Sequence, residues 1–384
     1  MADGSAATLA VGVEEELLLV DPGTGATVPA APEVCHAAAA MRAAGDDAAL
    51  RSRWSAARVE AVTGTCPTLD ELARRLVHNR VQLTTAARAA DVWLVPSGCA
   101  VLDGPVAPTE RFAGVADVYG GVVADHHPCG CHVQVGVPDP ETAVAVVNHL
   151  RPWLPTLLAL SVNSPFTGGA DTGYASWRAV QRSRLPASGM PPHFASVRAY
   201  EARVARLAEQ GVLVDDASPL WLARPVPRLS AVDLRVADTG IDVDATLLQA
   251  ALTVALVRTA LTDLAAGREA PAIGEQVAAT ALWSSARHGM AGPGIHPVLE
   301  RQAPAAVLVT ELLAAVRPAL EDLGATQMVR EAVRRLLRSD TATATATATD
   351  TGTGTGTGAA RQRAAGDPYE VVRMLATSTV PGAG

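Results

Sequence analysis

The stretch "VGVEEELLLVD", Val11 to Asp21, places three consecutive glutamates inside a run of valines and leucines. The run has the composition of a buried β-strand, in which successive side chains point to opposite faces. Glu14 and Glu16 then share one face, and Glu15 points to the other. Two carboxylates side by side on a half-buried face repel each other unless protons, arginines or a metal ion accompany them. A charged edge strand that discourages aggregation is the alternative, and this stretch alone does not decide between the two.

The composition limits the chemistry that is available to the chain. With 384 residues, 49% of them hydrophobic, the chain can build one large domain or two ordinary ones. Its net charge of −8 favours neither a nucleic acid nor an anionic membrane as a partner. All 31 basic residues are arginines, which excludes a lysine nucleophile, a Schiff base and a Walker-type phosphate lysine. Any phosphate must therefore be held by arginines, backbone amides or a metal ion.

Three features predict a cytoplasmic protein. The chain opens without the basic and apolar regions of a secretory signal. Its most apolar later stretch, "ATLLQAALTVALVRTALTDLAA", contains Gln249 and Arg258, which predicts a buried helix and not a membrane span. Five cysteines in a chain of this length fit reduced cytosolic thiols better than a disulfide framework.

Four predicted strands share one pattern, with polar side chains opposite a row of valines and leucines. Strands that are far apart in sequence can pair in an antiparallel sheet, so their polar faces would form one concave floor. Carboxylates with an imidazole suit Mg²⁺ or Mn²⁺, and an arginine beside them suits phosphate. The combination predicts an ATP site of the non-P-loop kind. The polar residues are Glu14 and Glu16, then Glu60, then His132 and Gln134, and finally Asp233 and Arg235.

Five motifs resemble the bacterial carboxylate–amine ligases of the glutamate–cysteine ligase type 2 group. They are "VGVEEELLLVD", "CGCHVQVGVPD", "NHLRPWLPTLLALSVNSPF", "DTGYASWR" and "RVADT", and the resemblance resumes at "GTGAARQRAA". It implies an α+β, glutamine-synthetase-like fold, a curved antiparallel sheet with helices packed on its outer face. It also implies ATP-dependent joining of a carboxylate, typically the γ-carboxylate of glutamate, to an amine such as that of cysteine. Mg²⁺ would help ATP to phosphorylate the carboxylate, and the amine would then displace phosphate from the acyl phosphate.

The resemblance also implies roles for single residues. Two positions depart from the family pattern: Gln134 replaces a second histidine, and Asp233 replaces a glutamate. Aspartate is one methylene shorter, which can cost a metal contact, and glutamine cannot titrate near neutral pH. The implied metal ligands are Glu14, Glu16, Glu60, His132 and Asp233; Arg235 would contact phosphate and act in catalysis, and Arg235, Gln134 and Arg198 would bind ATP or substrate.

We expect one catalytic domain over residues 9–338, a low-complexity loop over 340–358 that reads "DTATATATATDTGTGTGTG", and a C-terminal helical segment over 359–378. A homodimer is a further expectation, because the apolar helices would exceed what one core needs. Two other functions stay open. One is a non-catalytic binding protein on the same fold, and the other is a metal-dependent amide hydrolase that uses the same ions to activate water.

Overall fold

The computed structural model describes residues 10–41, 49–51, 55–104, 110–123, 128–214, 219–342 and 355–380. In these residues a seven-stranded sheet has the order β10-β11-β5-β1-β3-β2, and β4 also pairs with β1. Every pairing in this sheet is antiparallel, and the four strands predicted to meet are direct neighbours in it. The strands are β1 (Val11–Val20), β2 (Ala49–Arg51), β3 (Arg58–Val62), β4 (Trp93–Val95), β5 (Gly130–Gly136), β10 (Ala223–Val226) and β11 (Ala231–Asp238).

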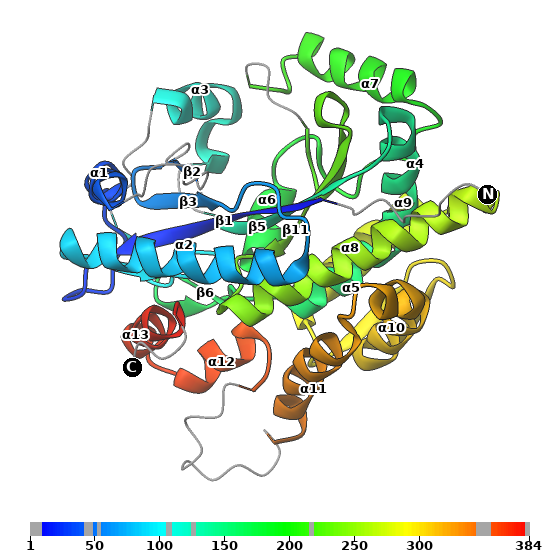
Figure 1. Cartoon of the computed structure of the whole chain (residues 1–384). Helices are drawn as coiled ribbons and strands as arrows, with labels where there is room; N and C mark the ends of the chain where they lie inside the picture. Colours follow the sequence, from blue (N-terminus) through cyan, green and yellow to red (C-terminus); the bar gives the residue numbers. More distant parts are fainter. Residues whose placement is uncertain are drawn as a thin grey trace.

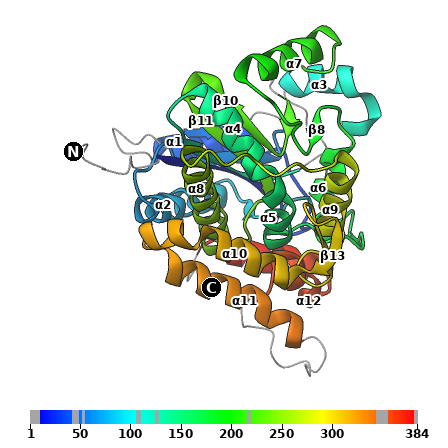
Figure 2. The same cartoon turned by 90° about the vertical axis from the view of Figure 1, so that its right-hand side faces the viewer.

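The apolar face of this sheet is covered by helices. Val13, Val133 and Leu234, from three adjacent strands, are at most 2% exposed and belong to one hydrophobic cluster with the helices α4 (Pro140–Leu150), α5 (Leu154–Ser161) and α8 (Val243–Ala265). Figure 2 shows these helices beside the sheet, with α10 (Ala305–Asp322) and α11 (Thr326–Ala342) outside them. The predicted α+β fold, with an antiparallel sheet and helices packed on its outer face, is confirmed.

Helix α8 is the one described helix that is long and apolar enough to cross a membrane. It packs against α2 (Leu69–Ala89), α4 and α10, and Leu252 and Ala255 on it are fully buried. The prediction of a buried core helix for this stretch is therefore confirmed.

Helix α2 is capped at its N-terminus by Thr68, whose side chain accepts a hydrogen bond of 3.1 Å from the backbone N–H of Glu71.

The smaller elements surround this core (Figure 1). The remaining helices are α1 (Ala31–Ala40), α3 (Glu110–Tyr119), α6 (Trp177–Ser183), α7 (Val197–Glu209), α9 (Glu275–His288), α12 (Gly358–Ala365) and α13 (Pro368–Ser378). Short two-stranded ladders pair β6 (Phe166–Thr167) with β7 (Ala170–Asp171), β8 (Ser188–Gly189) with β9 (Leu220–Trp221), and β12 (Pro293–His296) with β13 (Arg301–Pro304).

The C-terminal helices pack against the body of the protein. On α12, Gln362 Nε2 donates to Asn163 Oδ1 at 2.8 Å, and after α13, Thr379 Oγ1 donates to Leu94 O at 3.0 Å. The predicted loop over 340–358 is shorter than expected at both ends, because residues 340–342 belong to α11 and Thr357 caps α12. A Cβ on Gly358 would lie 2.1 Å from Asn163 Oδ1, so this end of the segment is tightly packed. Residues 343–354 of the predicted loop lie outside the described residues.

Candidate active site

The three glutamates of β1 divide between the two faces of the sheet, as strand alternation predicts. Glu15 lies on the helix side and is 1% exposed. Its carboxylate accepts from Arg80 Nη2 at 2.6 Å, from Arg80 Nε at 3.1 Å and from Thr246 Oγ1 at 2.6 Å. Arg80 is fully buried as well. Glu15 is therefore part of a buried ion pair between the sheet and the helices, and Glu14 and Glu16 are left on the opposite face, which we call the polar face.

The strand register brings the predicted site residues together on the polar face. Glu14 lies opposite His132, Glu16 opposite Glu60, and Asp233 opposite Gln134. His132 Nδ1 is 3.4 Å from Glu14 Oε1. Four strands that are far apart in sequence thus contribute one continuous patch of carboxylates and an imidazole, most of it buried.

Arginines neutralise the two buried carboxylates on β1 and β3. Arg58 Nη2 lies 3.3 Å from Glu16 Oε1 and 3.8 Å from Glu60 Oε1. The backbone N–H of Gly130 donates to Glu16 Oε2 at 2.7 Å. Burial by itself would raise the pKa of Glu16, but the charge of Arg58, helped by that of Arg178, outweighs it and lowers the pKa. Glu16 is therefore an ionised carboxylate inside the protein.

Asp233 is held in the same way at the other side of the patch. Its Oδ2 accepts from Arg224 Nε at 2.9 Å and lies 3.3 Å from Arg235 Nη1. Burial would raise the pKa of Asp233, but Arg235 and Arg224 more than offset it, and the pKa is lowered. Asp233 Oδ1 is buried and has no hydrogen-bond partner in the described part of the chain. The predicted phosphate-binding residue Arg235 thus lies beside one oxygen of Asp233, and the other oxygen of the same carboxylate is open to a further ligand.

The imidazole of His132 is neutral. Burial and the charge of Arg235 lower the pKa of His132 well below its usual range. Its Nε2 is buried without a hydrogen-bond partner among the described residues. A neutral imidazole nitrogen and an open carboxylate oxygen, on Asp233, are the kinds of donors that a divalent cation binds. The donor chemistry therefore fits a metal ion, although no three histidine, cysteine, aspartate or glutamate side chains in the described ranges are grouped as a complete metal site.

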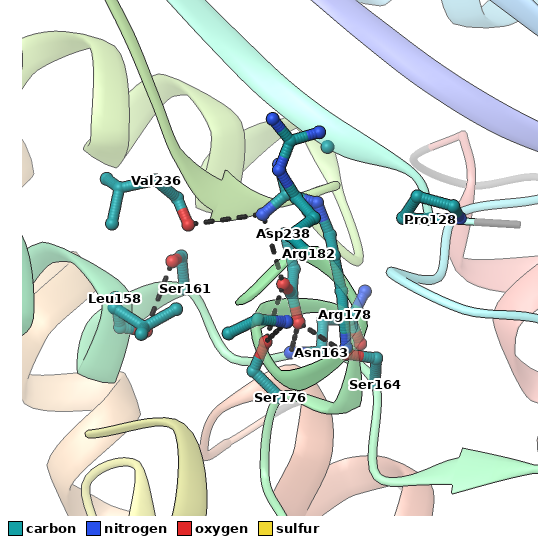
Figure 3. A network of polar contacts seen from close by, with 12 residues as sticks. Pro128, Leu158, Ser161, Asn163, Ser164, Ser176, Arg178, Arg182, Val236 and Asp238 are labelled. Atoms are coloured by element: carbon teal, nitrogen blue, oxygen red, sulfur yellow. Dashed lines mark hydrogen bonds and ion pairs between the residues drawn. The ribbon is translucent and has the colours of Figure 1, made fainter. Parts of the chain in front are cut away.

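A bulge in β11 adds an aspartate that the sequence pattern did not reveal. The register with β5 shifts between Leu234 and Ala237, so that Asp238 lies opposite Gly130 and joins the polar face. Asp238 is 1% exposed, and its carboxylate accepts from Ser164 Oγ and Ser176 Oγ, both at 2.8 Å (Figure 3).

Arg178, at the start of α6, fixes this bulged strand. Its Nη2 donates to the backbone carbonyl of Arg235 at 3.0 Å, and its Nη1 donates to that of Val236 at 3.2 Å. Its Nη1 is also 3.6 Å from Asp238 Oδ1. A Cβ on Gly130 would lie 2.2 Å from Arg178 Nη2, so only glycine leaves room for this guanidinium. Arg178 therefore holds the backbone that carries Arg235.

The other two predicted binding residues lie differently. Gln134 is half-buried on β5 opposite Asp233, within the patch. Arg198 is exposed in the first turn of α7, a helix that packs against α4 and whose buried residues include Tyr200. In the part of the chain that the structure describes, no hydrogen bond or ion pair joins Arg198 to a residue of the polar face.

Five charged residues of the polar face were not predicted from the sequence. Arg58, Arg178, Arg182 and Asp238 are buried, and Arg224 is half-buried. Two of them lie in motifs that resemble the ligase family: Arg178 ends "DTGYASWR", and Asp238 lies in "RVADT". The motifs could have pointed to these two residues, whereas Arg58, Arg182 and Arg224 had no such signal.

Comparison with known proteins gives one consistent family. The family model for glutamate–cysteine ligase family 2 matches residues 10–365. A protein of Saccharopolyspora erythraea with the provisional name glutamate–cysteine ligase 2-2 is 50% identical over 97% of this chain and 93% of its own length. A protein of Nocardia farcinica with the provisional name glutamate–cysteine ligase 2-1 is 40% identical over 85% of each chain.

Solved structures agree on the fold. A Francisella tularensis glutamate–cysteine ligase in complex with AMP superposes with a TM-score of 0.65 at 12% identity, over 97% of this chain and 89% of its own. The complex between the ubiquitin-like protein Pup and its ligase PafA gives a TM-score of 0.55 at 12% identity, over 93% of this chain and 68% of the other. The fold and the sequence matches together show that the chain belongs to glutamate–cysteine ligase family 2, a family of ATP-dependent carboxylate–amine ligases.

Proposed function

We propose that this member of the family joins the γ-carboxylate of glutamate to the amine of cysteine, with ATP as the energy source. The observation that carries the proposal is the polar face, where buried carboxylates and a neutral imidazole lie among arginines. Such a site suits a phosphoryl group that is held with a divalent cation. The names of relatives that match this chain over most of its length support this substrate pair.

The residues that would hold a divalent cation, Mg²⁺ or Mn²⁺, are Glu14, Glu16, Glu60, His132 and Asp233. When bound, the ion would supply positive charge that neutralises the phosphates of ATP. Glu16 and Asp233 have lowered pKa values and are therefore already ionised to receive a cation. His132 is neutral and keeps Nε2 open, which is the state that metal binding requires.

The reaction has two steps. An oxygen of the γ-carboxylate attacks the γ-phosphorus of ATP, and ADP leaves with the electrons of the broken P–O bond. The amine nitrogen then attacks the carbonyl carbon of the acyl phosphate, loses a proton, and expels inorganic phosphate. Arg235 stabilises the transferred phosphoryl group, because its guanidinium lies beside Asp233 and its backbone is held by Arg178. No lysine is available for this role.

An ADP-release assay with single omissions tests the proposal. With Mg²⁺, ATP, glutamate and cysteine, we expect ADP and phosphate in equal amounts, and little ADP when either amino acid is omitted. An amide hydrolase would turn over its substrate without ATP, and a binding protein would release no ADP at all. A panel of other carboxylates and amines in the same assay tests the substrate pair.

A cytoplasmic location and a homodimer belong to this proposal as well, and light scattering of the purified protein tests the dimer.

A further inference from the structure

Arg182 lies one helical turn after Arg178 on α6, and both side chains extend from the helix toward the strands (Figure 3). Arg182 is only 8% exposed. Its Nη2 makes one long hydrogen bond, of 3.4 Å, to the backbone carbonyl of Leu220, and its Nε is buried without a partner. Within the described ranges, no carboxylate lies within ion-pair distance of this guanidinium.

The other arginines of the polar face each have a carboxylate. Arg58 pairs with Glu16, Arg178 lies beside Asp238, and Arg224 and Arg235 share Asp233. Arg182 is therefore the one buried arginine of the described polar face that has no carboxylate within ion-pair distance.

The position of Arg182 is unfavourable in the free protein. Burial, and then the charges of Arg178 and Arg235, lower the pKa of Arg182 well below its usual value. A guanidinium does not deprotonate in a protein, so the arrangement lowers stability instead. A bound anion would compensate this charge, and the fork of five N–H donors is suited to two oxygens of one oxyanion.

We propose that Arg182 binds an oxyanion of a substrate at the polar face, either a phosphoryl group of the nucleotide or a carboxylate of the amino acid. The identity of these ligands rests on the proposed function. The two sources share one chemistry, a negative charge spread over two or three oxygens, which a planar guanidinium holds through two parallel hydrogen bonds. Arg182 would thus add to the polar face a positive charge that no described carboxylate pairs with directly.

Titration calorimetry on Arg182→Gln tests the proposal, with three separate probes: ADP with Mg²⁺, L-glutamate and inorganic phosphate. We expect affinity for at least one probe to fall by about 10- to 100-fold, the range for losing hydrogen bonds to a charged group. Arg184→Gln is the matched control, because it removes the same charge two residues away at an exposed position. Arg182→Lys keeps the charge without the fork and should recover part of the affinity.

Thermal unfolding without ligand separates this role from a structural one. Removing an uncompensated buried charge should leave the unfolding temperature of Arg182→Gln unchanged or raise it. A lowered unfolding temperature with wild-type affinity for all three probes would make Arg182 structural and overturn the proposal. If Arg182→Gln does not fold, wild-type affinity of Arg182→Lys for every probe would overturn it instead.

The pattern of losses identifies the ligand. Weaker binding of ADP and phosphate assigns Arg182 to the nucleotide, and weaker binding of glutamate alone assigns it to the amino acid. Equal affinity of the wild type and Arg182→Gln for all probes overturns the proposal, while ADP release with both substrates would still support the ligase. Conversely, phosphate binding that depends on Arg182, without ADP release from any substrate pair, would leave the anion site standing and contradict the proposed function. A wild type that binds none of the probes would contradict both.

Discussion

Glu14 and Glu15 are neighbours in sequence, yet the structure predicts opposite consequences for replacing them. In Glu15→Gln the side chain keeps its volume but loses its charge, so that Arg80 remains buried with its ion-pair partner removed. In Glu14→Gln the change falls on the polar face, where the side chain is 15% exposed and faces His132. The first variant should lose stability, and the second should lose activity.

The size of the first effect follows from the burial of both partners. Breaking a buried ion pair by removing one side typically costs about 3–5 kcal/mol of unfolding free energy. For a chain of 384 residues, with an unfolding entropy near 0.8 kcal/mol/K, this corresponds to a fall of about 4–6 °C in Tm. The double variant Glu15→Leu with Arg80→Met should recover most of this loss, because an apolar pair of similar volume replaces the ion pair.

Two assays on each variant distinguish a loss of stability from a loss of activity. The first is denaturant unfolding without metal, and the second is ADP release at about 20 °C with Mg²⁺, ATP, glutamate and cysteine. We expect Glu15→Gln to release ADP at close to the wild-type rate while folded. We expect Glu14→Gln to unfold within about 1 kcal/mol of the wild type and to lose at least about 10²-fold in turnover, the scale for removing one preorganised electrostatic group. Equal losses of turnover in the two variants would refute the assignment of the two faces.

Three further changes probe the polar face. Arg235→Lys keeps the charge but loses the planar fork, so turnover should fall at least about 10²-fold with the fold intact; a near-silent change would leave Arg235 as a structural partner of its neighbours. Gly130→Ala should lower the free energy of unfolding by about 1–3 kcal/mol and lower turnover, because its Cβ would lie 2.2 Å from Arg178 Nη2. Gly136→Ala on the same strand should change both quantities little, because the atom nearest to its Cβ lies 3.7 Å away. In the wild type, His132 is neutral when folded, so the unfolded chain takes up a proton first as pH falls below about 6.5, and the free energy of unfolding decreases. In His132→Gln this proton uptake is absent. The free energy of unfolding of the variant should therefore decrease less between pH 7 and pH 5 than that of the wild type. A difference between wild type and His132→Gln that does not change from pH 7 to pH 5 would contradict this.

Strand alternation carried much of the prediction from sequence. Because the period of two is regular along β1 and β5, it placed Glu14, Glu16 and His132 on one face and Glu15 on the other. The partner of Glu15 could not be read in the same way, since Arg80 is 65 residues away on a helix and its pairing depends on how that helix packs.

The same rule failed where the backbone departs from it. In a regular strand Asp233 and Asp238 would point to opposite faces, because five positions separate them. The bulge in β11 adds one residue between them and so places Asp238 on the polar face. Arg178 and Arg182 lie on the short helix α6. The position of these two side chains relative to the sheet depends on the loop before the helix, so the alternation along the strands could not predict it. Arg198, which the sequence predicts to bind ATP or substrate, lies exposed on α7, and this role stays a prediction.

The most direct test of the account is the fate of oxygen during turnover. With L-glutamate carrying ¹⁸O in both γ-carboxylate oxygens, an acyl phosphate intermediate transfers one ¹⁸O to inorganic phosphate and leaves the other in the amide. Mass spectrometry of both products, with Mg²⁺, ATP and cysteine present, should therefore find one ¹⁸O in each phosphate released and an equal amount of γ-glutamylcysteine. Phosphate without ¹⁸O, or ATP consumption without the amide product, would contradict it.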